Sequence, residues 1–594
     1  MPILALLPRP RRVRLSGTER VLAAEPTVSP AHGLPAQGYR LNIAADGVRL
    51  EAADPPGEFY ARRTLAQLRT LHPDGQLPVG TVEDWPDLPV RGAMVDVSRC
   101  RVPTLERLLE LVERLANLKV NHLELYMEHT FAYEGHREVW AAADPFDADD
   151  MARLQSFCAE RFVELVPNQN TLGHMERWLL HERYSPLGIL RGVGANAIGL
   201  PVPASTLDPA HPGSARLAAD LVSQLSAAVP AGRFHAGLDE PWDLPSSRVS
   251  EWAGWVEGLR RLPALEGREL LVWADMLAAH PEMVESLPAE TTLCEWGYDA
   301  GHPFADRLDS LGRAGHAVWL CPGTSSWISF AGRVDNAVTN CREAASAAAG
   351  GAAGLLVTDW GDFGHHQAEA VSDVGFAAAA AFSWCLESNR DLDAPAIGRL
   401  LDIHSFRPDP RSGGRSVGSA LVALGNAYRA VPCGLPNVSA LTLHLYFPQL
   451  PVGSAVTFGL QAEHLDAAEE AVSAARRHLE RAVPASPYGR RATAELGVTA
   501  NFLDIAIADA RARLDAGGHL AGVPATVRNS LAERLRAVIQ DYRATWPARS
   551  RPGGLEESCA WLEHLLGCYE TGVARPDWAG PLVDEARRRM AARR

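Results

Sequence analysis

Between residues 92 and 362 the sequence repeats one pattern, in which a short apolar run is mostly followed by a stretch with helical spacing. The eight apolar runs begin near residues 92, 120, 162, 233, 269, 291, 317 and 353. The helical stretches between them include 105–118, 215–229 and 337–350. Strands that alternate with helices form a parallel sheet, and eight such units close into a barrel. The sequence therefore predicts an α/β protein whose residues 89–404 form a (β/α)₈ TIM barrel.

Two further regions flank the predicted barrel. Residues 1–88 contain an alternating stretch, 39–53, with a turn at Asp46-Gly47 that is typical of a β-hairpin. A helical pattern at 58–71 follows, so we expect a small α/β domain. Residues 405–594 carry helical patterns rich in Ala, Leu, Arg and Glu at 461–483, 493–516, 525–545 and 555–571. We expect a mainly α-helical C-terminal domain that packs against the barrel or a second subunit, which leaves a homodimer open.

The composition excludes several classes of partner. The net charge of the chain is −15, whereas nucleic acids and anionic membranes bind basic surfaces. No apolar stretch approaches the length of a membrane span. The nine cysteines are scattered and form no Cys-x-x-Cys pair, as expected for reduced thiols and not for a disulfide framework or a zinc site. Basic residues follow the apolar start of the chain, the wrong order for a secretory signal. We expect a cytoplasmic protein with no nucleic-acid or membrane partner.

Residues that can carry chemistry gather where the predicted strands end. In barrel enzymes the active site lies at the carboxyl ends of the strands. The residues at these ends are Asp96, Glu128, Asn168, Asp239, Glu240, Asp275, Glu295, Tyr298, Thr324 and Asp362. Several tryptophans lie at or near the ends of the last four strands, namely Trp273, Trp296, Trp319, Trp327 and Trp360. Aromatic rings stack on the flat C–H faces of sugars, so the set favours a carbohydrate pocket over ordinary core packing.

The sharpest single feature is the sequence FHAGLDEPW at 234–242, in which Asp239 and Glu240 end the fourth strand. Neighbouring strand residues point to opposite faces, so both carboxylates reach one site only where the strand ends. A glycosidase needs one carboxylic acid to protonate the leaving oxygen and a second group to stabilise the cationic centre. Taken alone, such a pair is also typical of a solvated acidic strand end or a helix cap. Its place after a buried strand and among tryptophans favours catalysis.

These motifs together resemble glycoside hydrolase family 20, the β-N-acetylhexosaminidases, over residues from about 20 to 400. HAGLDE at 235–240 matches the family's His-x-Gly-x-Asp-Glu signature. The stretch 83–99 is similar to the family's entry into its first strand, and DWGD at 359–362 is similar to its late Trp-x-acid motif. LVPNQNTLGH at 165–174 occupies the place of the family's third-strand motif.

The resemblance implies a role for each matching residue. Glu240 is expected to act as general acid and then as base, and Asp239 to orient the substrate's acetamido group. Arg91 is expected to bind the 3- and 4-hydroxyls of the sugar, and Asp362 the 4- or 6-hydroxyl. His174 is expected to belong to the supporting polar network. The pocket is expected to be walled by Trp273, Trp296, Trp327 and Trp360.

The sequence departs from the family pattern in three places. Asn170 stands where the family commonly has an aspartate. No tyrosine follows the seventh strand to bond the acetamido oxygen, so Tyr298 is the substitute that we expect. The end of the second strand, with Glu128, His129 and Tyr133, is expected to shape a different subsite. These departures bear on substrate preference more than on the class of reaction.

The resemblance implies an exo-acting β-N-acetylhexosaminidase with a substrate-assisted, retaining mechanism and no cofactor. The substrate is expected to be a small carbohydrate with terminal β-linked N-acetylglucosamine or N-acetylgalactosamine. A related glycosidase of altered specificity, such as one that releases a disaccharide, and a sugar-binding barrel without activity remain alternatives. His365 and His366 in GHHQ are weak evidence for a metal, since no further ligands match them. We therefore expect no metal site.

Overall fold

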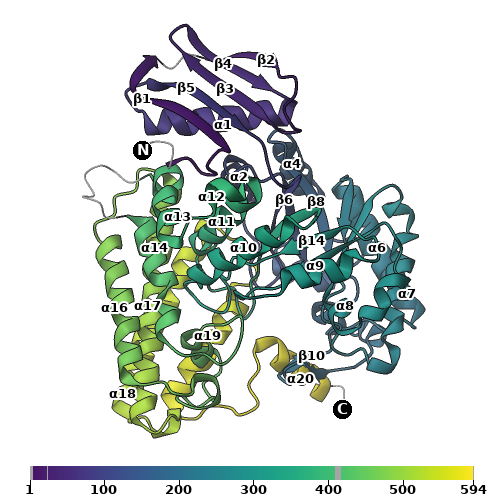
Figure 1. Ribbon diagram of the computed structural model, residues 1–594. Coiled ribbons are helices and arrows are strands. Elements are labelled where there is room, and N and C mark those ends of the chain that lie inside the picture. The colour runs from purple at the N-terminus through teal and green to yellow at the C-terminus, as the bar shows by residue number, and fades with distance from the viewer. Residues whose placement is uncertain (1–4, 23–24, 408–415, 593–594) are drawn as a thin grey trace.

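The structure, a computed structural model, describes residues 5–22, 25–407 and 416–592. Eight parallel strands close into a barrel in the order β11-β12-β13-β14-β15-β6-β7-β8 (Figure 1). Their bounds are β6 (Val90–Asp96), β7 (His122–Met127), β8 (Glu164–Gln169), β11 (Arg233–His235), β12 (Glu269–Trp273), β13 (Thr291–Trp296), β14 (Val318–Cys321) and β15 (Gly354–Asp359). Each strand coincides with one of the eight apolar runs, with β6 beginning two residues before its run, so the predicted TIM barrel is confirmed.

Helices outside the barrel cover its strands with one apolar face each. In α2 (Leu105–Asn117), Leu108, Val112 and Leu115 are buried, and they recur at the spacing of one helix face. The hydroxyl of Thr104 accepts a hydrogen bond from the backbone N–H of Arg107 and so begins the helix. The helices α6 (Pro212–Ala228) and α10 (Val334–Ala348) cover other strands in the same way. The helical stretches predicted from spacing thus correspond to α2, α6 and α10.

The N-terminal region forms a five-stranded sheet with one helix packed on it. The strand order is β1-β5-β3-β4-β2, with β1 (Arg12–Leu22), β2 (Thr27–Pro30), β3 (Tyr39–Ala44), β4 (Gly47–Ala52) and β5 (Gln76–Asp84). The helix α1 (Pro55–Leu71) contacts β3 and β4. The predicted hairpin is present, but because Ala44 pairs with Gly47 its turn lies at Ala45 and Asp46, one residue before the predicted Asp46-Gly47.

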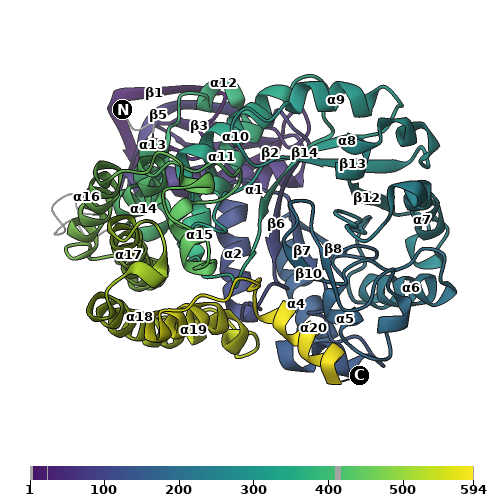
Figure 2. The ribbon, with the colours of Figure 1, turned by 90° about the horizontal axis from the view of Figure 1, so that it is seen from below.

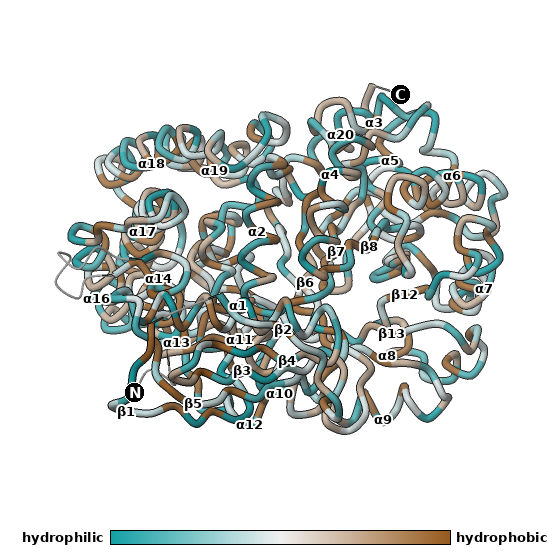
Figure 3. Tube along the Cα trace, turned by 90° about the horizontal axis from the view of Figure 1, so that it is seen from above, coloured by the Kyte–Doolittle hydropathy of each residue, from teal (hydrophilic) through white to brown (hydrophobic). Residues whose placement is uncertain are grey.

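Beyond the barrel, helices α11 (Asp373–Trp384) and α13 (Ala394–Leu401) lead into a helical region. Its first two helices are α14 (Val417–Gly425) and α15 (Ala440–Tyr446). The four predicted C-terminal helices appear as α16 (Ala462–Leu479), α17 (Pro487–Asp515), α18 (Ala525–Thr545) and α19 (Leu555–Thr571). Hydrophilic and hydrophobic residues alternate along α18 (Figure 3), as expected for a helix with one buried face. The helical C-terminal region is confirmed.

Among the elements that the sequence did not predict, a hairpin and the last helix lie side by side. A short hairpin of β9 (Val193–Ala195) and β10 (Pro201–Pro203) is inserted between β8 and α6. The last helix, α20 (Pro581–Ala592), leaves the helical region and lies beside β10 (Figures 1 and 2). Residues more than 370 positions apart in the chain therefore meet at one edge of the barrel, as the bond from Arg589 to the carbonyl of Leu180 shows.

Within the described parts of the chain, every helix is too short or too polar to cross a lipid bilayer.

Candidate active site

A pocket of about 350 Å³ opens at the carboxyl ends of the barrel strands. This volume lies within the range of small-molecule sites. The side chains that line its barrel side come from the ends of several strands and the loops after them: Arg99, Glu128, His174, Glu176, Asp239, Glu240, Trp296, Tyr298, Trp360 and Asp362. Of the eight further pocket positions expected from the sequence, five line the pocket, two contact the lining from behind and one, Arg91, does not reach it.

Asp239 and Glu240 both line the pocket because the chain turns sharply after β11. Leu238 and Glu240 have φ values of 77° and 47°, in the left-handed region that side chains other than glycine rarely adopt. The backbone N–H of Leu238 donates to Asn170 Oδ1 at 3.1 Å, and that of Glu240 donates to Asp275 Oδ2 at 3.0 Å. These two bonds hold the turn in place. In a strand, two neighbouring side chains would point to opposite faces, whereas in this turn both carboxylates lie on the same side.

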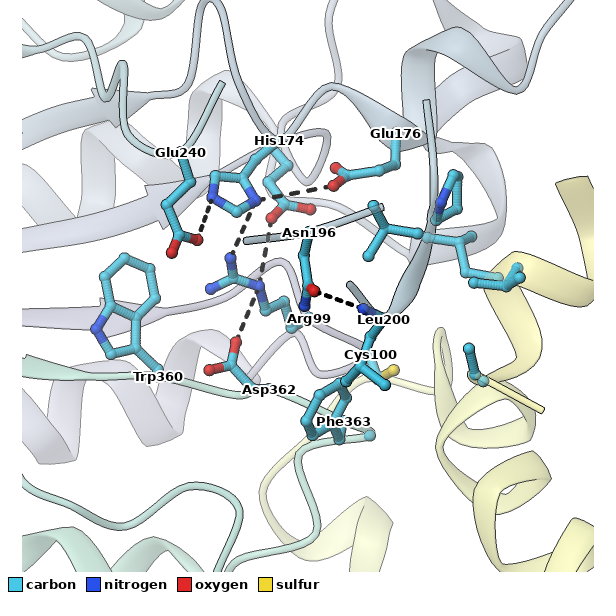
Figure 4. A pocket seen from close by; sticks show the side chains of 18 of the residues that line it. Arg99, Cys100, His174, Glu176, Asn196, Leu200, Glu240, Trp360, Asp362 and Phe363 are labelled. Atoms are coloured by element: carbon cyan, nitrogen blue, oxygen red, sulfur yellow. Dashed lines mark hydrogen bonds and ion pairs between the residues drawn. The ribbon is translucent and has the colours of Figure 1, made fainter. Parts of the chain in front are cut away.

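His174 lies close to both carboxylates, and Figure 4 shows its contact with Glu240. Its Nε2 lies 3.3 Å from Asp239 Oδ2 and 3.4 Å from Glu240 Oε2. Burial disfavours the imidazolium, but the charge of Asp239 and the hydrogen bonds to both carboxylates outweigh it, so the pKa of His174 is well above its ordinary value. Burial likewise opposes ionisation of Asp239, but His174 and Arg99 lower the pKa of this carboxyl below its usual value. Asp239 is therefore an anion and His174 a cation at neutral pH.

Arg99 is a pocket residue that the sequence reasoning missed. Its guanidinium lies 3.3 Å from Asp362, 3.4 Å from Glu128 and 3.1 Å from Asp96. It also lies over the rings of Tyr126 and Trp360, 4.9 Å from each centroid. The sequence contained a signal for this role, because Arg99 comes soon after Asp96 at the carboxyl end of the first strand, where the active sites of barrel enzymes lie.

Arg91, which was expected to bind the sugar, does not reach the pocket. It lies near the amino end of β6, at the opposite end of the strand from Asp96. Its buried guanidinium donates to the carbonyls of Lys119 and Leu88 and to Gln37 Oε1, at 2.8 to 2.9 Å. Because side chains at the amino ends of the strands face away from the site, Arg91 joins the barrel to the N-terminal sheet instead.

The four expected tryptophans differ in their exposure to the pocket. Trp296, Tyr298 and Trp360 line it. The rings of Trp296 and Tyr298 stack with centroids 5.1 Å apart, and Trp360 Nε1 donates to the Tyr298 hydroxyl at 2.9 Å. Trp273 and Trp327, in contrast, are buried behind this layer and do not line the pocket. Trp273 contacts Trp360 and Trp327 contacts Tyr298, so both support the wall without forming it.

Asn170, the departure from the family aspartate, connects two parts of the site. Its Nδ2 donates to the Tyr126 hydroxyl at 2.8 Å, while its Oδ1 accepts from Leu238 in the turn. An amide can donate and accept at once, which an ionised carboxylate cannot do. Asn170 thus positions the catalytic turn without adding a charge.

Burial raises the pKa of three other acids around the site. Burial and the charge of Asp239 raise the pKa of Asp275 to about 8. Burial, partly opposed by Arg99, raises the pKa of Asp362 to about 6. Burial also raises the pKa of Glu176 to about 7. Of the second-strand residues that were expected to shape a subsite, Glu128 lines the pocket, whereas His129 and Tyr133 are buried away from it.

Among the described residues, no group of three or more His, Cys, Asp or Glu side chains is arranged to hold a metal ion. His366 in GHHQ instead contacts the Tyr446 hydroxyl at 2.6 Å and the Ser558 carbonyl at 3.0 Å. The pocket therefore offers acids, one imidazolium, two guanidiniums and aromatic rings for chemistry.

Two regions of the chain match models of the same protein family. Residues 5–85 match "Glycosyl hydrolase family 20, domain 2", and residues 88–370 match "Glycosyl hydrolase family 20, catalytic domain". The chain is 26% identical over 235 residues to a beta-hexosaminidase of Akkermansia muciniphila, covering 35% of this chain and 46% of that protein. It is 22% identical over 262 residues to a lacto-N-biosidase of Bifidobacterium bifidum, covering 40% of this chain and 22% of that protein. The chain thus aligns with less than half the length of either relative.

Solved structures share the fold. A mutant beta-hexosaminidase of Streptomyces plicatus in complex with its product GlcNAc superposes with a TM-score of 0.54 at 17% identity, over 68% of this chain and 95% of that chain. A β-N-acetylhexosaminidase of Streptomyces coelicolor A3(2) gives the same TM-score and identity over 68% of this chain and 96% of that chain. The family matches end at residue 370, before the helical region that follows the barrel.

Proposed function

The chain belongs to glycoside hydrolase family 20 and is a glycoside hydrolase, and we propose that it is an exo-acting β-N-acetylhexosaminidase. The substrate would carry a terminal β-linked N-acetylglucosamine or N-acetylgalactosamine. Similarity to a beta-hexosaminidase over 235 residues supports this substrate class.

One observation carries the proposal. Asp239 Oδ1 is buried beside Glu240 and has no hydrogen-bond partner among the described residues. A buried carboxylate oxygen without a donor is unfavourable, so the position favours a ligand that brings a donor with it. The N–H of an acetamido group is such a donor. The anionic state of Asp239, maintained by His174 and Arg99, suits this contact.

The proposed reaction uses the substrate's own acetamido group as the nucleophile. Asp239 accepts the acetamido N–H and orients the carbonyl oxygen toward C1, while Glu240 protonates the glycosidic oxygen as the C1–O bond breaks. The resulting cyclic oxazolinium ion is stabilised by the Asp239 charge. Glu240 then removes a proton from water as the water attacks C1 and opens the ring. Two displacements at C1 restore the β configuration. Tethering the nucleophile also removes much of the positioning cost.

An NMR time course of the first sugar anomer released from an N-acetyl-β-glucosaminide tests the mechanism. We expect the β-anomer first, and initial release of the α-anomer would exclude the retaining pathway. A panel of chromogenic β-glycosides tests the substrate class in parallel. N-acetylhexosaminides should be cleaved and the matching glucoside, which lacks the acetamido group, should be a very poor substrate. Preferential cleavage of disaccharide glycosides would favour the alternative of altered specificity, and inactivity on the whole panel a sugar-binding barrel.

A further inference from the structure

The pocket has a second wall opposite its barrel side, formed by residues that take no part in the proposed reaction. Part of it comes from the hairpin region, residues 193–203, through Asn196, Leu200, Pro201, Val202 and Pro203. The other part comes from residues 578–583, which we call the strap, through Ala579, Gly580, Pro581, Leu582 and Val583. Figure 4 shows the barrel residues Trp360 and Glu240 on one side of the pocket and Asn196 and Leu200 on the other. The strap lies more than 200 residues beyond the end of the family match at residue 370.

The strap is fixed to the helical region at its start. Trp578 Nε1 donates to the Tyr446 carbonyl at 3.0 Å, and the Trp578 carbonyl accepts from Gln449 Nε2 at 2.9 Å. The Trp578 ring stacks on His564 with centroids 3.8 Å apart. Gly580, at φ 106°, passes so close to Trp561 that a Cβ there would lie 2.5 Å from its ring. These contacts make the strap a fixed part of the wall.

The hairpin region is braced by α20, which continues from the strap. Arg589 Nη1 donates to the Leu180 carbonyl at 3.0 Å. Met590 packs against Gly192 so tightly that a Cβ on the glycine would lie 2.0 Å from the sulfur. The chain after the hairpin is tied to the catalytic turn, because Asp243 Oδ2 accepts from the backbone of Ser205 at 2.8 Å and of Thr206 at 3.1 Å. The second wall is therefore held beside Glu240, where a leaving group must depart.

The second wall is largely apolar, whereas the barrel side of the pocket carries more acidic than basic side chains. Val202, Pro203, Leu582 and Val583 present hydrocarbon surface of the kind that packs on a sugar's C–H face. Among the cations nearby, Arg177 is paired with Glu557 at 2.6 Å. Glu128 and Glu176 also lie near the catalytic pair, and the cations closest to them, Arg99 and His174, are shared with Asp362 and Asp239.

We propose that the strap and the hairpin region form the binding site for the group that leaves with the glycosidic oxygen, and that this site takes an uncharged sugar ring packed through its C–H face. The assignment rests on the proposed hexosaminidase function. It makes the C-terminal segment of this chain a determinant of specificity, with α20 as a positioning element. The acidic side chains on the barrel side of the pocket would repel an anionic leaving group and so weaken its binding.

Two variants, Val202→Ser and Leu582→Ser, test the two halves of the wall. The substrates are N,N′-diacetylchitobiose, which has a sugar as leaving group, and methyl N-acetyl-β-glucosaminide, which does not. We expect kcat/KM for the disaccharide to fall by about tenfold in each variant, mainly through KM, since lost apolar packing of a side chain is of this order. The methyl glycoside should change by less than about threefold. The matched control is Arg588→Ala, on the same helix as Leu582 but 69% exposed and away from the pocket.

A thiazoline mimic of the cyclic intermediate, which occupies the hexosamine part alone, reports on the catalytic pocket. Its inhibition constant should stay within about twofold of the wild-type value in both variants. An equal fall in kcat/KM for both substrates, or no fall for either, would overturn the assignment of the wall while leaving the proposed function intact. A wild-type protein that cleaves neither substrate would refute the proposed function and the assignment with it.

The charge argument has its own test. The 4-carboxyphenyl and 4-(methoxycarbonyl)phenyl N-acetyl-β-glucosaminides differ in one negative charge and in leaving-group ability, and only the effect of the charge responds to salt. The neutral ester should have the higher kcat/KM, by roughly fivefold at low ionic strength, and the gap should narrow as salt screens the acids. A ratio that does not respond to salt, or that favours the carboxylate, would contradict an acidic leaving-group site.

Discussion

The acids of the pocket are held in different protonation states by their surroundings. Asp239 is stabilised as an anion by His174, whereas Asp275, which accepts only a backbone N–H among the described residues, has its pKa raised to about 8. Pairs of carboxyls whose pKa values are driven apart are typical of acid–base sites. The protonation state of each acid therefore depends on whether a cation, such as His174, or another carboxylate lies next to it.

Replacing Glu240 by glutamine tests the role of the acid. Glu240→Gln should lower kcat/KM for substrates with poor leaving groups by about 10²–10⁴-fold, the usual worth of general acid catalysis. Aryl glycosides with good leaving groups should lose less in the first step, because their oxygen needs little protonation. Steady-state kinetics on a methyl and a 2,4-dinitrophenyl N-acetyl-β-glucosaminide make the comparison. Small and equal losses on both would remove Glu240 from this role.

The raised pKa of Asp275 predicts a pH-dependent gain in stability for Asp275→Asn. In the unfolded chain this acid ionises near pH ~4, whereas in the folded protein it stays protonated up to about 8. The folded state therefore binds more protons between these values, and the wild-type protein loses stability as pH rises through this window. Asparagine does not titrate and can still accept from Glu240. The melting temperature of the variant minus that of the wild type should rise from pH 4 to pH 8, by at least about 2 °C. A flat or falling difference would contradict the protonated state.

At the scale of elements, the turn between β11 and the catalytic pair decides where the carboxylates point. Gly237 has φ 72°, followed by Leu238 at 77°. A Cβ on Gly237 would lie 1.6 Å from Asn170 Oδ1, the atom that holds Leu238. Strain of this kind is common at active sites, where the surrounding structure maintains it.

Gly237→Ala is therefore expected to displace Asn170 and the turn. We expect a loss of at least about 1–3 kcal/mol in the free energy of unfolding and a large fall in kcat, with circular dichroism and kinetics as the measurements. Gly258→Ala is the matched control, since a Cβ there meets no atom within 4 Å. Wild-type activity in Gly237→Ala would show that the turn does not position the pair.

At the scale of the whole molecule, the N-terminal sheet is joined to the barrel by a buried charge. Lys119 Nζ lies 2.8 Å from Asp84 Oδ2 and 2.9 Å from the Tyr39 hydroxyl, and Trp384 Nε1 donates to the same carboxylate. Burial lowers the pKa of Lys119, and the charge of Asp84 opposes that shift. Neither partner reaches solvent, so each depends on the other.

Asp84→Asn should destabilise this junction by about 3–5 kcal/mol, because it leaves a buried ammonium without its counter-charge. Urea denaturation monitored by tryptophan fluorescence measures the change. The pocket is built by other residues, so kcat/KM should be nearly unchanged at temperatures where the variant is folded. Restoring a neutral pair with Asp84→Asn/Lys119→Met should recover part of the loss. No destabilisation in the single variant would contradict a structural role for this charge.

Local patterns in the sequence are enough to locate the barrel, the flanking regions and the acidic pair Asp239-Glu240. Apolar runs and helical spacing are local patterns, so all eight barrel strands and the four long C-terminal helices could be located from them. HAGLDE could be recognised as a site because its residues are contiguous. Only the tertiary structure decided which side chains reach the pocket. Arg91 lies near the amino end of β6, whereas Arg99 lies in the loop after its carboxyl end, so the two side chains face opposite ends of the barrel. Trp273 and Trp327 resembled wall residues but are covered by Trp360 and Tyr298. The strap and the hairpin region meet through contacts between residues hundreds of positions apart, and no local pattern encodes such a meeting.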